Sequence, residues 1–298
     1  VRGVARDAAL FPDHGRPRAG GERRHRALRR VGQAQARPLS RRGRAQRSAA
    51  GLVSLIHGIR QSMNSPAFDP RTLFDLSGKR ILVTGASMGL GKRFGWTLAR
   101  AGAEVLLAAR SVDKLEALAA DIAAFGGRCK CVALDVRERD VIRATVDQLE
   151  QEGPIDVLVN NAGIAIVRAP ERFSDEDWDQ VYETNLRGPW ALAQAIIKHR
   201  LADGRPGNII NVASILGFRP IGHLAPYAAA KAALINLGRE LCVDLAAKGI
   251  RVNALNPGYF ETEMNREWLA SPGGQKLLKG IPTGRFGQPE DLDGAILF

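Results

Sequence analysis

From residue 79 onward, short runs rich in Val, Ile and Leu alternate with longer amphipathic segments. Near-continuous apolar strands separated by helices indicate strands buried on both faces, which is typical of a parallel sheet covered by helices on two sides. Because crossovers between parallel strands are right-handed, this alternation predicts an α/β fold with a doubly wound parallel sheet in a single domain. Strands are expected at 79–86, 103–110, 130–136, 155–163, 207–214 and 250–258, and helices at 90–102, 111–127, 137–153, 175–200 and around Tyr227.

The excess positive charge of the chain lies in its first 62 residues. The formal net charge is +12, and residues 1–62 hold 15 Arg, no Lys and three acidic residues, so residues 63–298 are balanced. This Arg-, Gly- and Ala-rich leader has no helical or strand period and cannot bury enough apolar surface to offset its ordering entropy, so it is predicted to be disordered. Three interpretations compete: a basic arm for nucleic acid, a transit peptide, or a leader produced by a mis-annotated upstream start. The absence of lysine and the position of Met63 favour the third.

The three cysteines, Cys129, Cys131 and Cys242, form no C-x-x-C pair. Cys129 and Cys131 share one face of an expected strand, so we expect core residues rather than metal ligands, and no metal site. This cysteine usage indicates a reducing, cytoplasmic location. No apolar run approaches the ~20 residues that span a bilayer, so no membrane partner is expected.

A glycine-rich turn follows the first expected strand. Residues 84–91 read TGASMGLG, with Gly85, Gly89 and Gly91. Glycines permit a tight turn and close approach of a ligand, and the helix that follows directs its free N–H groups at a pyrophosphate. This pattern predicts a Rossmann-like dinucleotide site, the alternative being a strand–helix turn that binds nothing.

The end of the second strand bears on the choice of cofactor. A site for NAD usually has an acidic residue here, about 20 residues after the turn, which binds the ribose 2′-hydroxyl. This chain has Ala109 and Arg110, so no carboxylate repels a 2′-phosphate and one cation can neutralise it. The sequence therefore favours NADP(H), while NAD(H) stays possible because Met88 adds no second charge. The alternative for Arg110 is an ordinary solvated side chain.

Further motifs follow in a fixed order: LDV at 134–136, NNAG at 160–163, ETNLRG at 183–188, NVAS at 211–214, Tyr227 and Lys231 in YAAAK, and NPGYFETEM at 256–264. Over roughly residues 75–298 this set resembles the short-chain dehydrogenase/reductase family, in the branch with T-G-x-x-x-G-x-G spacing. Within the family it is similar to both 3-oxoacyl-acyl-carrier-protein reductases and gluconate 5-dehydrogenases. The family normally continues beyond the equivalent of residue 298, so 63–298 is expected to be a C-terminally truncated NAD(P)-binding domain without its last edge strand.

The resemblance assigns catalytic roles. A phenol with a pKa near 10 is a poor acid at neutral pH, and an ammonium one helical turn away lowers that pKa. The family pattern implies that Tyr227 exchanges a proton with the substrate oxygen, that Lys231 tunes Tyr227 and binds the nicotinamide ribose, and that Ser214 donates to the substrate carbonyl. It also implies that Asn185 anchors a water. The alternatives are a shared helix face for Tyr227 and Lys231 and a turn cap for Ser214.

The resemblance also implies a set of cofactor contacts. Asp135 and Val136 match the positions that meet the adenine, and Asn161 the position beside the adenosine ribose. The full set is Gly85, Ser87, Met88, Gly89, Leu90, Gly91, Arg110, Asp135, Val136, Asn161, Ala162, Gly163, Tyr227, Lys231, Pro257, Gly258, Phe260 and Thr262.

The sequence thus predicts an oxidoreductase that transfers a hydride between NADP(H) and a small-molecule carbonyl or secondary alcohol. In the full-length protein we expect a homodimer or homotetramer, with no nucleic-acid partner for 63–298. Two alternatives remain: a redox-inactive nucleotide-binding regulator on the same fold, and a nucleic-acid-binding protein that acts through the Arg-rich leader.

Overall fold

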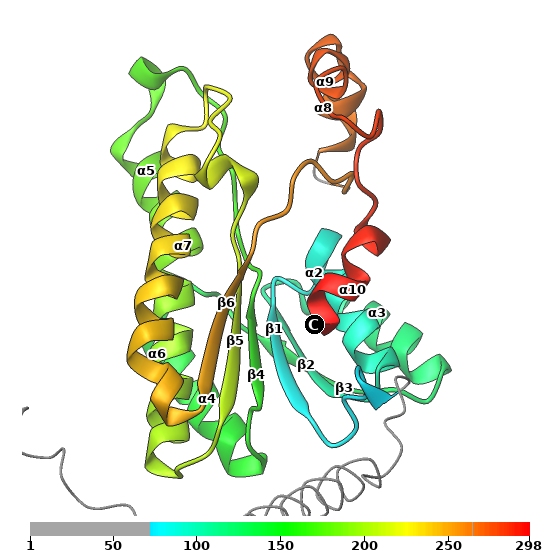
Figure 1. The fold of residues 1–298 in the computed structure, drawn as a ribbon, viewed down its shortest axis with the longest axis vertical. Helices are drawn as coiled ribbons and strands as arrows, with labels where there is room; N and C mark the ends of the chain where they lie inside the picture. Colours follow the sequence, from blue (N-terminus) through cyan, green and yellow to red (C-terminus); the bar gives the residue numbers. More distant parts are fainter. Residues whose placement is uncertain (1–71, 264) are drawn as a thin grey trace, which may run out of the picture. The chain divides into compact units, whose positions relative to one another are not determined.

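The computed structural model describes residues 72–263 and 265–298, and within them six parallel strands form one sheet (Figure 1). The Arg-rich leader and its predicted disorder lie outside the described residues. The strand order is β3-β2-β1-β4-β5-β6, which confirms the doubly wound parallel sheet. The strands are β1 (Arg80–Thr84), β2 (Glu104–Ala109), β3 (Arg128–Ala133), β4 (Val157–Asn160), β5 (Gly207–Val212) and β6 (Ile250–Leu255).

Helices cover both faces of the sheet, as strands with near-continuous apolar runs require. Figure 1 shows α4 (Arg139–Glu152), α6 (Gly188–Ala202) and α7 (Ala225–Leu245) on one side, and α2 (Gly89–Arg100), α3 (Val112–Ala124) and α10 (Asp293–Leu297) on the other. The sheet has a hydrophobic core on each face. Leu82 of β1 packs into the first core, on the side of α4 and α6, and Ile81 and Val83 pack into the second core, with Phe94 of α2. Cys129 and Cys131 of β3 also pack against this second core.

The strand order of the sheet reverses once, beside β1, and the edge of the sheet at this point is here called the crevice. From β1 the chain winds outward through β2 to β3, and it then returns to β4 on the other side of β1. The crossovers therefore diverge at the carboxyl ends of β1 and β4, which is where ligands bind in open sheets of this kind.

The helical region expected at 175–200 consists of three segments. α5 (Asp175–Tyr182) begins at a capping box between Ser174 and Asp177, a π-helical turn covers Glu183–Arg187, and α6 follows with Pro189 in its first turn. π-helical turns occur frequently at functional sites. This one carries Asn185, whose side chain is fully buried.

The segment after β6 leaves the sheet and returns to α2. It contains α8 (Arg266–Ala270), α9 (Pro272–Leu278), a 3₁₀ turn (Pro289–Leu292) and α10. The carboxylate of Asp293 at the start of α10 accepts hydrogen bonds from Arg93 and Thr97 of α2. These contacts fix α10 against α2, on the face of the sheet that α2 and α3 cover.

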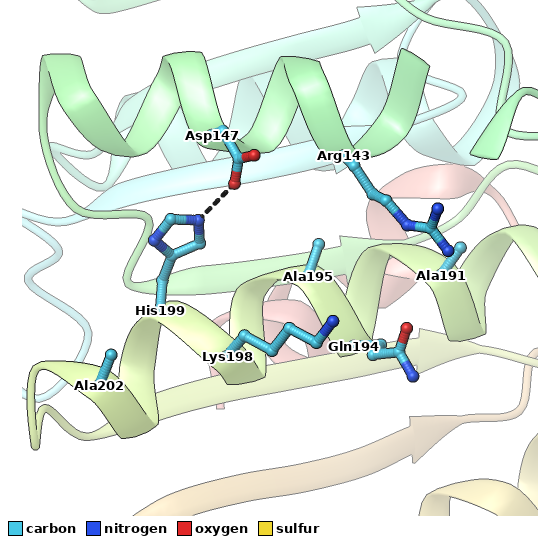
Figure 2. A pocket seen from close by; sticks show the side chains of 8 residues that line it. All are labelled: Arg143, Asp147, Ala191, Gln194, Ala195, Lys198, His199 and Ala202. Carbon is cyan, nitrogen blue, oxygen red and sulfur yellow. Dashed lines mark hydrogen bonds and ion pairs between the residues drawn. The ribbon is translucent and has the colours of Figure 1, made fainter. Parts of the chain in front are cut away.

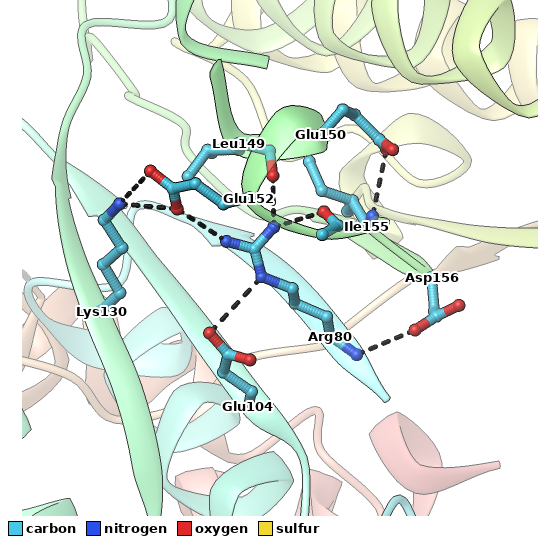
Figure 3. Close-up of polar contacts among 9 residues, drawn as sticks. Arg80, Glu104, Lys130, Leu149, Glu150, Glu152, Ile155 and Asp156 are labelled. Atoms are coloured by element: carbon cyan, nitrogen blue, oxygen red, sulfur yellow. Dashed lines mark hydrogen bonds and ion pairs between the residues drawn. The ribbon is translucent and has the colours of Figure 1, made fainter. Parts of the chain in front are cut away.

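A buried arginine braces the amino ends of the strands (Figure 3). The guanidinium of Arg80, at the start of β1, donates to the carbonyl oxygens of Leu149 and Gly153 at the end of α4, and it pairs with Glu104 and Glu152. A cation is favourable at this position because the last carbonyls of a helix carry partial negative charge. This cluster lies at the end of the strands opposite to the crevice.

Within the described ranges, no helix is long and apolar enough to cross a bilayer. The same residues contain no group of three or more His, Cys, Asp or Glu side chains arranged to hold a metal ion.

Candidate active site

Tyr227 and Lys231 lie in the first two turns of α7. The ammonium of Lys231 is 5.6 Å from the centroid of the Tyr227 ring, and it donates to the carbonyl of Val212 at 2.7 Å. Val212 ends β5, so this bond ties the helix to the crevice. The Lys231 side chain is 4 % exposed, and burial lowers its pKa to about 8. Burial also raises the pKa of the Tyr227 phenol, and a hydrogen bond with Ser214 opposes this shift.

Ser214 follows β5 and faces Tyr227. Its Oγ accepts from the N–H of Leu216 at 3.1 Å and so caps a 3₁₀ turn (Ile215–Gly217). The cap alternative is therefore observed, but it uses only the acceptor side of the hydroxyl. The hydroxyl hydrogen can still be donated, to Tyr227 or to a substrate oxygen.

Asn185 reaches the crevice from the π-helical turn. Its Oδ1 accepts from the N–H of Ile164 and its Nδ2 donates to the carbonyl of Ile164, both at 2.8 Å. A Cβ at Gly163 would lie 3.0 Å from Asn185 Oδ1 and 3.5 Å from Lys231 Nζ. Gly163 therefore allows the close approach of these side chains. The side-chain amide of Asn185 thus makes two hydrogen bonds with Ile164 and keeps a second N–H on Nδ2.

The glycine-rich turn is closely packed. Gly85 and Gly89 have positive φ angles of 65° and 53°, and a Cβ at Gly91 would lie 2.2 Å from the carbonyl oxygen of Gly85. The side-chain amide of Asn161, just after β4, donates to the carbonyls of Thr84 and Gly85 and so links the turn to the end of β4. The remaining predicted residues of these loops are Ser87, Met88, Leu90 and Ala162, and the N–H of Ala162 donates to Thr84 Oγ1 at 3.1 Å.

The expected adenosine end contains an ion pair that the sequence analysis missed. Arg110, which follows β2, is exposed. Arg137 donates to both carboxylate oxygens of Asp135, with distances of 2.7 to 3.2 Å. These bonds, and to a smaller extent the nearby Arg110, hold the pKa of Asp135 below its usual range. Val136 is a core residue with 7 % exposure.

The segment after β6 lies against the glycine-rich turn. The amide of Asn265 binds Thr262 N and the carbonyl of Phe260, each at 2.9 Å, and shapes the loop. The Thr262 methyl would lie 3.4 Å from a Cβ at Gly89. Pro257 accepts from Ile215 N at 2.9 Å, and a Cβ at Gly258 would meet open space.

These residues fit a nicotinamide dinucleotide. The N-cap residue of α2, Met88, makes no side-chain hydrogen bond, and the first turn of the helix holds no acidic residue. Such a helix N-terminus attracts an anion of the pyrophosphate type. Lys231 has three N–H donors and, among the described residues, one hydrogen bond, so it can still bind ribose hydroxyls.

A separate groove of about 310 Å³ lies between α4 and α6 (Figure 2). An Asp147–His199 contact of 2.7 Å crosses it. It contains none of the sequence-predicted residues and lies outside the candidate active site. Its lining residues are Arg143, Asp147, Ala191, Gln194, Ala195, Lys198, His199 and Ala202.

Comparison with known proteins decides the family. The short chain dehydrogenase family model matches residues 79–272. The chain belongs to the short-chain dehydrogenase family. It is similar to the gluconate 5-dehydrogenase of Gluconobacter oxydans, with 41% identity over 76% of this chain and 89% of the relative. It is also similar to the 3-oxoacyl-[acyl-carrier-protein] reductase of Thermotoga maritima, with 38% identity over 75% of this chain and 90% of the relative.

A solved structure supports the same assignment. The gluconate 5-dehydrogenase of Burkholderia cenocepacia, in complex with NADP and tartrate, matches with a TM-score of 0.74 and 38% identity, over 77% of this chain and 91% of that one. As a member of the short-chain dehydrogenase family, this chain is an NAD(P)-dependent oxidoreductase that acts on CH–OH groups of a small molecule.

Sequence reasoning anticipated the residues near Tyr227 and missed two side chains. Arg137 was recognisable only as one charge among several in the stretch DVRERD. Glu263 lies on the segment after β6, and its Oε2 accepts from the N–H of Gly89 at 3.1 Å. No local pattern signals a contact between residues 174 positions apart.

Proposed function

We propose that this short-chain dehydrogenase interconverts a ketone and a secondary alcohol with NADP(H), and that Tyr227 is its general acid and base. The observation that carries the proposal is the convergence of Ser214, Tyr227 and Lys231 at the carboxyl end of β5. A redox-inactive nucleotide-binding protein would have no use for a buried phenol with a hydroxyl donor and an ammonium beside it.

The three side chains have complementary roles in this proposal. A bound nicotinamide would supply or accept the hydride. Ser214 donates its hydroxyl hydrogen to the substrate oxygen, where negative charge develops during reduction. Tyr227 transfers its phenolic proton to that oxygen, and Lys231 stabilises the phenolate that remains. Burial alone raises the pKa of Tyr227, so the positive charge of Lys231 is needed to bring this pKa toward neutrality.

The preference for NADP(H) rests on charge. Arg110 is exposed at the end of β2, next to Ala109, and can pair with a 2′-phosphate. Arg137 adds a second cation nearby, although Asp135 neutralises it. The match to a relative solved with NADP is consistent with this preference.

For the substrate, we propose the hydroxy- and keto-acid pair of a sugar acid. Support comes from the gluconate 5-dehydrogenase of G. oxydans and from the 5-keto-D-gluconate 5-reductase of Escherichia coli, which is 33% identical to this chain. A second candidate is a 3-oxoacyl thioester, because the T. maritima reductase is 38% identical.

The test compares wild type with Tyr227→Phe, using 5-keto-D-gluconate and acetoacetyl thioester as substrates and following NADPH oxidation. Removing a general acid is expected to lower kcat by about 10²- to 10⁴-fold, while NADPH binding by fluorescence stays within about twofold. Tyr182→Phe is the control, because Tyr182 stacks on Trp178 in α5 and should retain activity. Full turnover by Tyr227→Phe would contradict the role of this phenol.

A further inference from the structure

The N-terminus of α2 already holds a carboxylate. Gly89 is the first residue of α2, and its N–H donates to Oε2 of Glu263 at 3.1 Å. Neither Met88 at the N-cap nor a residue of the first turn provides an anion. The negative charge at this helix end therefore comes from the segment after β6, where helix N–H groups and the helix dipole stabilise it.

The main chain beside Glu263 is fixed by hydrogen bonds. Glu261 N donates to Gly287 O, and Gly287 N donates to Tyr259 O, both at 2.9 Å. Thr262 is bound by Asn265 and packs on Gly89. The exposed carboxylate of Glu263 can thus leave the helix by side-chain rotation alone, while the loop that carries it keeps its place.

A carboxylate and a phosphate compete for the same donors. Both are anions that accept from backbone N–H groups at a helix N-terminus. We propose that Glu263 is an internal competitor for the cofactor: its carboxylate occupies the N-terminus of α2 in the free chain and is displaced when the cofactor pyrophosphate binds there. This inference rests on the cofactor site of the proposed function.

The geometry makes the effect of Glu263 independent of the adenosine end. Glu263 contacts the glycine-rich turn, whereas the charges that distinguish NADP(H) from NAD(H) are those of Arg110 and Arg137, after β2 and β3. Displacement of Glu263 is therefore a common step for both nucleotides. It weakens the binding of each by the same factor and leaves the preference between them unchanged.

The experiment measures binding to the full chain with Glu263→Gln, which removes the charge and keeps the size. NADPH and NADH are titrated by fluorescence, and inorganic pyrophosphate by calorimetry. Loss of one exposed carboxylate from a helix N-terminus is expected to tighten all three by about two- to fivefold. Glu116→Gln is the matched control, because it removes an exposed negative charge from the neighbouring α3 without touching Gly89.

The outcomes separate this inference from the function on which it rests. Unchanged or weaker binding of both nucleotides to Glu263→Gln would overturn the competition, and so would equal tightening in Glu116→Gln, which would indicate a general charge effect. If the wild-type chain bound neither nucleotide, the proposed function itself would fail.

Discussion

The ammonium of Lys231 lies 5.6 Å from the ring centroid of Tyr227 and, among the described residues, has one hydrogen-bond acceptor, the carbonyl of Val212. A buried cation with one acceptor is incompletely compensated for its lost hydration. The pKa of Lys231 falls to about 8 for this reason. Burying the Lys231 ammonium beside Tyr227 therefore lowers the stability of the folded chain at neutral pH.

This cost predicts a pH dependence of stability. The pKa of Lys231 is about 8 in the folded chain and 10.5 for an ordinary ammonium, so between these values the unfolded chain binds more protons than the folded one. Stability then rises with pH across this window. Against Lys231→Met, the wild type should gain about 3 kcal/mol in the free energy of unfolding between pH 7 and 11, as measured by urea denaturation.

The control for this prediction is Lys248→Met, which removes an exposed lysine just after α7. A rise in stability with pH that is equally large against Lys248→Met would contradict the assignment of the effect to Lys231. A constant difference for Lys231→Met would mean that Lys231 is fully hydrated in the folded chain.

Arg110 should decide between the two nucleotides. Arg110→Ala removes the exposed cation after β2, so NADPH is expected to bind about tenfold more weakly, a loss of ~1.4 kcal/mol. NADH should be unaffected because it has no 2′-phosphate. Fluorescence titration measures both, with Arg143→Ala on α4 as a control for net charge. Equally weakened binding of NADPH and NADH would mean that Arg110 supports the fold and does not bind the 2′-phosphate.

The sheet could be predicted from the sequence because its information is local. The middle of β1 (RILVT) is the apolar run Ile81, Leu82 and Val83, and a short strand of this kind has few alternatives to a buried parallel sheet. Tyr227, Lys231 and Ser214 could be identified as candidate site residues because the ordered motifs, at their spacing, resemble those of the short-chain dehydrogenase/reductase family. The residues between those motifs carried no such signal.

What could not be predicted depends on contacts between distant residues or on side-chain rotation. Nothing in the stretch 183–188 indicates a π-helical turn, which forms where α5 and α6 meet around buried Asn185. The bond between Glu263 and Gly89 requires the loop after β6 to return to the first turn of the sheet. The Arg137–Asp135 pair depends on a rotamer choice among several charged neighbours.

Gly91 is expected to tolerate no side chain. A Cβ there would lie 2.2 Å from the carbonyl oxygen of Gly85 and 2.4 Å from Nδ2 of Asn161, and the first of these is backbone that cannot rotate away. Gly91→Ala should destabilise the protein by about 1–3 kcal/mol, as measured by thermal unfolding. It should also weaken the binding of NADPH and NADH, as measured by fluorescence titration. Gly294→Ala in α10 is the matched control, because its Cβ would meet open space. Equal melting temperatures for the two variants would mean that the turn can relax.

Arg80 should contribute more to stability than any exposed charge near it (Figure 3). Its guanidinium is buried, with 9 % side-chain exposure, and serves the carbonyl oxygens of Leu149 and Gly153. Arg80→Met would leave these oxygens without their donor in a site that water reaches poorly, so a loss of about 2–4 kcal/mol is expected in urea denaturation. Lys130→Met removes the exposed partner of Glu152 and should cost much less, because exposed ion pairs contribute little. Equal losses would place the stabilising charge at Glu152 instead of at the end of α4.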